Sequence, residues 1–163
     1  MIKVGILTAS DKGYAGERID ESGKIIMEAV KQIDGDVAHY SLVPDDREVI
    51  ASSLVAMADD LGIDLILTTG GTGFSPRDIT PEATLDVIDR QAPGIPEAMR
   101  LKSLEITSRA MLSRAVAGIR NRTLIINLPG SPKAVQECLE VIIPVLPHAI
   151  QIIKGQTGEC GRK

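Results

Sequence analysis

The sequence has few aromatic side chains and no excess of positive charge. Aromatic residues make up 2% of the 163 residues, with one phenylalanine, two tyrosines and no tryptophan, and the formal net charge is -4. A protein that binds nucleic acid normally presents a basic surface or aromatic side chains on which bases stack. The composition therefore predicts a partner other than nucleic acid.

Cysteine and histidine are also scarce. Cys138 and Cys160 form no CxxC pair, and His39 and His148 have no partners at the spacing of zinc ligands. We interpret Cys138 as a core residue, because it follows the helical spacing of its apolar neighbours. The low cysteine content is typical of a protein in a reducing cytoplasm.

Long apolar runs are absent. No run approaches the roughly 20 residues that a helix needs to span a bilayer. The chain passes from Met1 directly into a predicted strand, with no apolar segment of the kind found in signal peptides. We therefore expect a cytoplasmic protein that does not bind a membrane.

Apolar strands alternate with amphipathic helices along the chain. Hydrophobic residues make up 44% of the sequence, and 163 residues suit a single domain. Strands are expected at residues 2–7, 37–43, 64–68 and 123–128, and helices at 20–33, 47–61, 80–90, 97–106 and from 132 onward, with kinks at Pro144 and Pro147. This alternation predicts an α/β fold with a mainly parallel central sheet. Residues 111–114 are expected to form a short edge strand or a lid, and 155–163 a mobile tail after a domain of residues 1–154.

The segment Thr68–Glu82, TTGGTGFSPRDITPE, contains the densest set of unusual residues. Glycines at 70, 71 and 73 allow a ligand to lie close to the backbone, and free N–H groups in such a loop suit a phosphate. The segment is neither a P-loop nor a GxGxxG motif. A tight turn between a strand and a helix is the alternative interpretation.

Other polar residues follow the remaining predicted strands. Ser10 and Asp11 follow the first strand, Asp45 and Asp46 the second, and Gly130-Ser131-Pro132 the last. Ligands of open α/β sheets bind at this carboxyl edge, so these loops are expected to meet there. Each residue also has a structural alternative, because Ser and Asp are common in turns and at helix N-caps.

The chemistry of these loops points to a phosphate-containing ligand, such as a nucleotide with a divalent metal. Asp45 and Asp78 suit Mg²⁺, which prefers oxygen ligands. Arg77, Arg114 and Lys133 are candidates to face phosphate charge. No Ser-His-Asp or Cys-His arrangement is visible, which disfavours acyl transfer.

The motifs together resemble a known family. TTGGTGFSPRDITPEAT, ILTASDKG, LVPDD, AMLSRAVAGIR and LIINLPGSPKAVQECLE are similar to the signatures of the molybdenum-cofactor biosynthesis family of MogA- and MoaB-like proteins, which includes molybdopterin adenylyltransferases. The resemblance implies a three-layer α/β sandwich and a homotrimer. It also implies that Mg-ATP adenylylates the terminal phosphate of molybdopterin and releases pyrophosphate. A hand-over of the product to a molybdate-inserting enzyme is a further expectation.

The resemblance also implies roles for particular residues. Asp45 and Asp78 are expected to be the catalytic and metal-binding pair, and Ser113 to belong to the pterin site together with Gly130, Ser131 and Pro132. The residues expected to bind nucleotide or phosphate are Ser10, Asp11, Gly70, Gly71, Thr72 and Gly73. A non-catalytic molybdopterin-binding sister protein and a relative that acts as a nucleotide pyrophosphatase are the alternative functions.

Overall fold

The computed structural model describes residues 1–158, so residues 159–163 of the expected tail lie outside the described part of the chain. Short 3₁₀ or π segments carry the label η. In chain order, the elements are β1 (Ile2–Ala9), α1 (Asp11–Tyr14), α2 (Glu21–Ala29), η1 (Val30–Ile33), β2 (Gly35–Val43), α3 (Arg47–Val55), η2 (Ala56–Asp60), β3 (Leu65–Thr69), α4 (Thr80–Val87), β4 (Arg90–Gln91), α5 (Gly94–Leu104), η3 (Ser108–Leu112), β5 (Ala117–Arg120), β6 (Thr123–Leu128), α6 (Pro132–Ile142), η4 (Ile143–Val145) and α7 (Leu146–Ile153).

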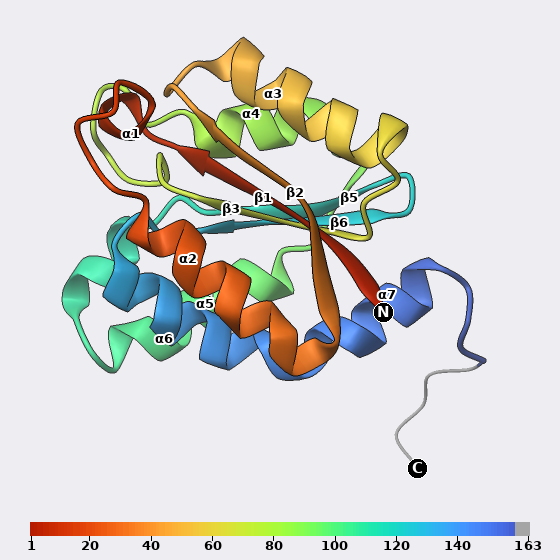
Figure 1. The fold of residues 1–163 in the computed structure, drawn as a ribbon. Coiled ribbons are helices and arrows are strands. Elements are labelled where there is room, and N and C mark those ends of the chain that lie inside the picture. The colour runs from red at the N-terminus through yellow and green to blue at the C-terminus, as the bar shows by residue number, and fades with distance from the viewer. Residues whose placement is uncertain (159–163) are drawn as a thin grey trace.

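The strands form one sheet in the order β2-β1-β3-β6-β5-β4. β2, β1, β3 and β6 run parallel, whereas β5 pairs antiparallel with β6 and β4 antiparallel with β5. The carboxyl ends of the parallel strands therefore lie at one edge of the sheet, on the side of α1 (Figure 1). The predicted α/β fold with a mainly parallel sheet is confirmed.

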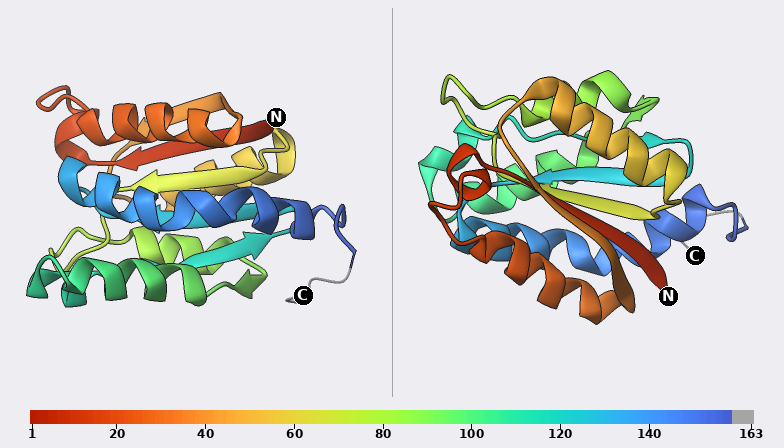
Figure 2. Two further views of the ribbon diagram at one scale, coloured as in Figure 1. Left: turned by 90° about the horizontal axis from the view of Figure 1, so that it is seen from below. Right: turned by 45° about the horizontal axis from the view of Figure 1, so that its top comes forward.

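Helices cover both faces of the sheet and make three layers. α3 and α4 lie on one face, and α2, α5, α6 and α7 lie on the other (Figures 1 and 2). Alternate residues of β1, β3 and β6 enter different cores: in β3, Leu65 and Leu67 pack on the α2–α6 side, whereas Ile66 packs on the α3–α4 side. Burial on both faces explains why these strands are continuous apolar runs in the sequence.

The antiparallel edge differs from the sequence prediction. Residues 111–114 form no strand: η3 ends at Leu112, and the strands at this side of the sheet are β5 and, at the edge, β4, which were not predicted. The helix expected to reach residue 90 ends at Val87, because β4 follows at Arg90. The loop after β1 also contains the short helix α1, for which Ser10 is the N-cap.

The last helical stretch bends where proline was expected to bend it. α6 ends at Ile142, η4 contains Pro144, and α7 contains Pro147. In the described part of the chain, one helical stretch, Pro132–Ile153, is long enough and apolar enough to cross a membrane. Core helices of other proteins pass the same test of length and composition. Val135, Cys138 and Leu139 of α6 are buried in the core beside the sheet, as expected for Cys138.

Candidate functional site

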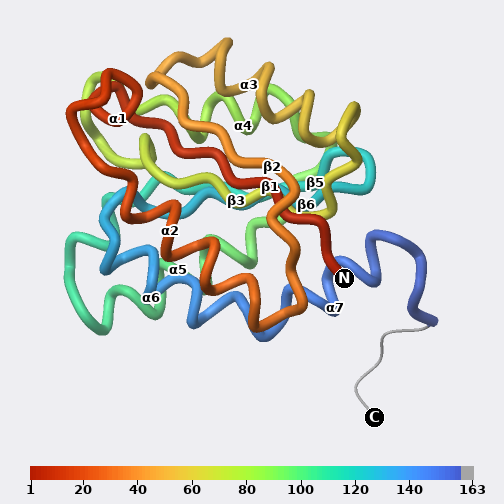
Figure 3. The backbone as a smooth tube through the Cα atoms, viewed as in Figure 1, coloured from red at the N-terminus to blue at the C-terminus, as the bar shows by residue number. Residues whose placement is uncertain are grey.

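The glycine loop, residues 70–73, leaves β3 at the carboxyl edge of the sheet. Gly70 and Gly71 have φ of +89° and +70°. A Cβ on Gly70 would lie 2.3 Å from the carbonyl oxygen of Ala9, and one on Gly71 would lie 2.4 Å from Thr80 Oγ1. Both positions therefore require glycine, because the loop crosses directly over the end of β1 and against the start of α4. Figure 3 shows the loop after β3 on the same side of the molecule as α1.

Asp11 and Asp45 connect the loops that follow β1 and β2. The Asp11 amide donates to Asp45 Oδ2 at 3.0 Å, and the Asp45 amide donates to Asp11 Oδ1 at 3.0 Å. Arg77 of the loop after β3 donates from Nε and Nη2 to the two oxygens of Asp11 at 2.9 and 3.1 Å. This pairing holds the pKa of the Asp11 carboxyl below its usual value. Asp11, expected at the nucleotide, thus joins the loops and lines neither of the two clefts of this region.

Asp45 is a half-buried carboxylate with one uncommitted oxygen. Its Oδ1 atom is buried and has no hydrogen-bond partner. Burial raises the pKa of the Asp45 carboxyl, and the negative charges of Asp11 and Asp78 add to this rise. Asp45 therefore gains a favourable interaction from any cation placed against Oδ1.

Asp78 reaches the same region from the other end of the glycine loop. Its Oδ2 atom accepts from the Ser75 amide at 2.9 Å, which closes the turn of residues 75–78. Ile79, not Asp78, is the N-cap residue of α4, and it makes no side-chain cap. The carboxylate of Asp78 therefore faces the glycine loop, where a Cβ on Gly73 would lie 3.0 Å from Oδ2.

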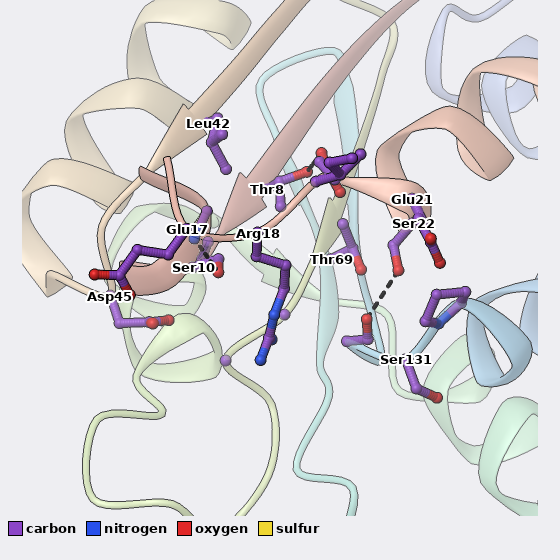
Figure 4. A pocket seen from close by; sticks show the side chains of 18 of the residues that line it. Thr8, Ser10, Glu17, Arg18, Glu21, Ser22, Leu42, Asp45, Thr69 and Ser131 are labelled. Carbon is purple, nitrogen blue, oxygen red and sulfur yellow. Dashed lines mark hydrogen bonds between the residues drawn. The ribbon is translucent and has the colours of Figure 1, made fainter. Parts of the chain in front are cut away.

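Two clefts adjoin each other along the glycine loop. The first cleft has a volume of about 870 Å³ and lies between the end of β1, the N-terminus of α2 and the glycine loop. Figure 4 shows this cleft, with Asp45, Arg18 and Ser131 around it. Its lining includes Thr8, Ser10, Arg18, Asp20, Asp45 and Gly70.

The second cleft has a volume of about 470 Å³ and lies between the glycine loop, α5, η3 and the N-terminus of α6. Its lining includes Met99, Thr107, Arg109, Leu112, Ser113 and Cys138. Gly71, Asp78, Gly130 and Ser131 line both clefts. A ligand in one cleft can therefore meet a ligand in the other at this shared wall.

The predicted site residues other than Asp11 line these two clefts, but some line a different cleft from the one expected. Ser10, Gly70 and Asp45 line the first cleft, whereas Thr72 and Gly73, expected at the nucleotide, line the second together with Ser113. Pro132, expected at the pterin, lines the first cleft. The glycine loop is thus shared between the two clefts.

The cations around the site differ from the sequence expectation. Arg77 is bound to Asp11, and Arg114 donates to the carbonyl oxygens of Gly73 at 2.7 Å and Asp78 at 3.1 Å and pairs with Glu82. Lys133 lines neither cleft. Arg18, which lines the first cleft, was not predicted, because it lies in a loop without a recognisable pattern.

The residues fit a magnesium–phosphate group. Among the described residues, no group of three or more His, Cys, Asp or Glu side chains is placed to hold a metal ion by itself. Mg²⁺ does not need such a cage, since it usually keeps waters and binds one or two carboxylates together with substrate phosphates. The buried, unpaired Oδ1 of Asp45 and the carboxylate of Asp78, both on the first cleft, suit this mode of binding.

Comparison with known proteins identifies the family. The family described as a probable molybdopterin binding domain matches residues 5–148. The chain belongs to this family. A molybdopterin adenylyltransferase of Helicobacter pylori (strain J99) is 45% identical over 99% of this chain and 93% of its own length. The resemblance drawn from the motifs is therefore confirmed.

A longer relative and a relative of known structure are also similar to this chain. Gephyrin from Dictyostelium discoideum is 47% identical over 94% of this chain, which matches only 23% of gephyrin. The molybdopterin biosynthesis enzyme MoaB from Thermus thermophilus, known from a crystal structure, is 54% identical, with a TM-score of 0.91 over 95% of this chain and 98% of that chain. The family thus occurs both as short chains and as part of longer proteins.

Proposed function

We propose that the protein is a molybdopterin adenylyltransferase, which transfers the adenylyl group of Mg-ATP to the terminal phosphate of molybdopterin and releases pyrophosphate. The observation that carries this proposal is the pair of adjoining clefts. A transfer between two substrates needs two sites whose reactive ends meet, and Gly71, Asp78, Gly130 and Ser131 form such a meeting place. The names of the relatives supply the identity of the substrates.

The two substrates are assigned to different clefts. The larger first cleft takes ATP, because Asp45 and Asp78 line it and suit the magnesium that accompanies the triphosphate. The second cleft takes the pterin, with Ser113 in its lining. The backbone of the glycine loop and the N-terminus of α6, capped by Ser131, then face the reacting phosphates from both sides.

The reaction depends on positioning and charge neutralisation. The terminal phosphate of molybdopterin is already an anion, so no general base is required for attack on the α-phosphorus. Bound Mg²⁺ supplies charge neutralisation at the phosphates. The protein's own contribution is to hold Asp45 and Asp78 on either side of the glycine loop, so that the substrates meet in line.

Asp78→Asn tests the proposal. The wild-type protein, incubated with Mg-ATP and molybdopterin, is expected to form adenylylated molybdopterin. The oxygen of the introduced amide can still accept from the Ser75 amide, so the variant should fold and bind molybdopterin. Its transfer rate should fall by roughly 10²–10³-fold, the typical cost of losing a preorganised electrostatic group.

Asp36→Asn is the matched control, because Asp36 is exposed on β2 and lines neither cleft. Asp45→Asn should behave like Asp78→Asn. Its neighbour Asp46 accepts from the Val49 amide at 2.9 Å as the N-cap of α3 and is not free to replace it. A transfer rate for Asp78→Asn within a few-fold of wild type would refute the catalytic role.

The remaining properties follow from the same assignment. We infer that the protein is a homotrimer in the cytoplasm and that it passes adenylylated molybdopterin to a molybdate-inserting enzyme. The second cleft opens beside α5 and η3, and the exposed apolar side chains of this region include Leu101, Ile106 and Met111. Such side chains suit contact with another protein chain.

A further inference from the structure

Arg18 differs from Arg77 and Arg114 because, in the described part of the chain, its guanidinium has no partner. Arg77 is held by both oxygens of Asp11, and Arg114 by the carbonyl oxygens of Gly73 and Asp78. Within residues 1–158, Arg18 makes no side-chain hydrogen bond and no ion pair, and it extends into the first cleft (Figure 4). Its exposed guanidinium is therefore available to a ligand of this cleft.

The acidic lining of the first cleft suggests that Arg18 binds the negative charge of a ligand there. Among the described residues of the lining, Arg18 is the only cation, and the acidic residues beside it are Glu17, Asp20, Glu21, Asp45 and Asp78. A nucleoside triphosphate brings several further negative charges into this acidic surface. One Mg²⁺ does not offset all of them, and a guanidinium binds phosphate oxygens through paired N–H donors.

The position of Arg18 selects the part of the triphosphate that it meets. The α-phosphorus must lie at the wall that both clefts share, since the attacking phosphate comes from the second cleft. In an in-line displacement, the leaving group departs on the side opposite to the nucleophile. The β- and γ-phosphates therefore extend into the first cleft, away from the second. Arg18 lines the first cleft and not the second.

We propose that Arg18 binds the β- and γ-phosphates of ATP and stabilises the departing pyrophosphate. This inference rests on the proposed function. A bond forms between an oxygen of the molybdopterin phosphate and the α-phosphorus, and the bond from the α-phosphorus to the β-bridging oxygen breaks. The pyrophosphate leaves with that electron pair, and the guanidinium faces the charge that develops there.

Arg18→Gln, measured by calorimetric titration with ATP, AMP and inorganic pyrophosphate in the presence of Mg²⁺, tests this assignment. Affinity for ATP and for pyrophosphate should fall about tenfold, the effect of losing one charge-assisted contact. Affinity for AMP should change by less than about twofold on the same reasoning. Arg18→Lys should recover part of the loss, because it retains the charge without the planar pair of donors.

Two control variants separate the outcomes. Lys12→Gln removes an exposed cation of α1 that lines neither cleft and should leave all three affinities unchanged. Arg109→Gln removes an exposed cation of the second cleft and should spare ATP. Equal losses for AMP and ATP in Arg18→Gln, or no loss for either, would overturn the inference. Because binding is measured without molybdopterin, these results hold even if wild-type protein forms no adenylylated product, which would instead refute the proposed function.

Discussion

Ser113 lies in the second cleft, on the segment between η3 and β5. Its hydroxyl oxygen accepts from the Ala115 amide at 3.3 Å, which leaves the hydroxyl hydrogen available for a ligand. Ser113→Ala should therefore weaken molybdopterin binding by about tenfold, as expected when one hydrogen bond to a charged group is lost. Affinity for ATP should stay within about twofold of wild type, since no such bond to ATP is removed.

Both affinities for Ser113→Ala can be measured by titration calorimetry. Ser52→Ala on the exposed side of α3 is the control. Equal losses for molybdopterin and ATP would contradict the assignment of the two clefts. They would indicate instead that Ser113 only supports the start of β5.

Tyr40 connects β2 to the N-terminus of α2 through its hydroxyl. Its hydroxyl donates to Asp20 Oδ2 at 2.6 Å, and the same oxygen accepts from Thr8 Oγ1 at 2.6 Å. Burial, together with the hydrogen bond and charge of Asp20, raises the pKa of Tyr40 to about 12. Alkaline titration of tyrosinate absorbance should show a step near this pH that is absent from Tyr40→Phe.

The sign of the stability effect follows from the raised pKa. The Tyr40 hydroxyl stabilises the folded state below its unfolded pKa of about 10, and this contribution is lost as pH rises through about 12. The difference in unfolding free energy between wild type and Tyr40→Phe should thus stay constant below about pH 10 and shrink above it. A difference that grows with rising pH in that range would contradict this reasoning.

The sequence predicts some residues of the site better than others. Asp45 follows the partly exposed strand β2, and Asp78 lies in the loop after the buried strand β3. Parallel strands bring such residues to one edge of the sheet. Asp20 is recognisable as the start of a helix, but no local pattern encodes its contacts with Tyr40 and Thr8. Arg18 lies in the irregular loop before it, so its place at the cleft is not predicted.

At the scale of elements, Arg114 connects the segment after η3 to the glycine loop. Its backbone amide donates to the Thr72 carbonyl at 2.8 Å, and its guanidinium binds the Gly73 and Asp78 carbonyls and Glu82. Arg114→Gln should lower the free energy of unfolding by roughly 1–3 kcal/mol, because it leaves the half-buried Glu82 carboxylate unpaired. Urea denaturation measures this change.

Arg47→Gln is the matched control for Arg114→Gln. Arg47 pairs with Asp86 between α3 and α4, where both side chains are more exposed. Exposed pairs contribute about 0–1 kcal/mol. Equal losses of stability in the two variants would show that Arg114 acts as an ordinary surface ion pair. A weaker affinity for ATP in Arg114→Gln alone would indicate that it holds the glycine loop in place.

The elements that were predicted and those that were missed differ in length and burial. β1, β3 and β6 are buried runs of apolar residues, so their type is clear from composition alone. β5 has four residues and β4 has two, which is too short for a periodic pattern. Their pairing also depends on the turn at Asn121, which has φ of +50° and follows β5 directly.

At the scale of the whole molecule, the order of strands determines where the site lies. β1 pairs with β2 on one side and β3 on the other, and β3 pairs with β6. The connections after β1 and β3 therefore leave the sheet beside each other, with those after β2 and β6 on either side. Alternation of strands and helices predicts this edge from sequence, but not the division into two clefts, which requires the positions of α2, α5 and η3.

The last prediction concerns assembly. The family resemblance implies a homotrimer, and a ring of three chains buries one patch of each chain against a different patch of the next. Leu101, Ile106 and Met111 are exposed by 70, 54 and 63%, so the isolated chain leaves apolar surface in water at α5 and η3. Light scattering at micromolar concentration should therefore give a mass three times the 17.4 kDa of one chain. The mass should not rise further when the concentration is raised roughly tenfold, because a closed ring leaves no free patch for another chain. A mass of one chain under these conditions would contradict the prediction, and a mass of two chains would replace the ring with a two-fold interface.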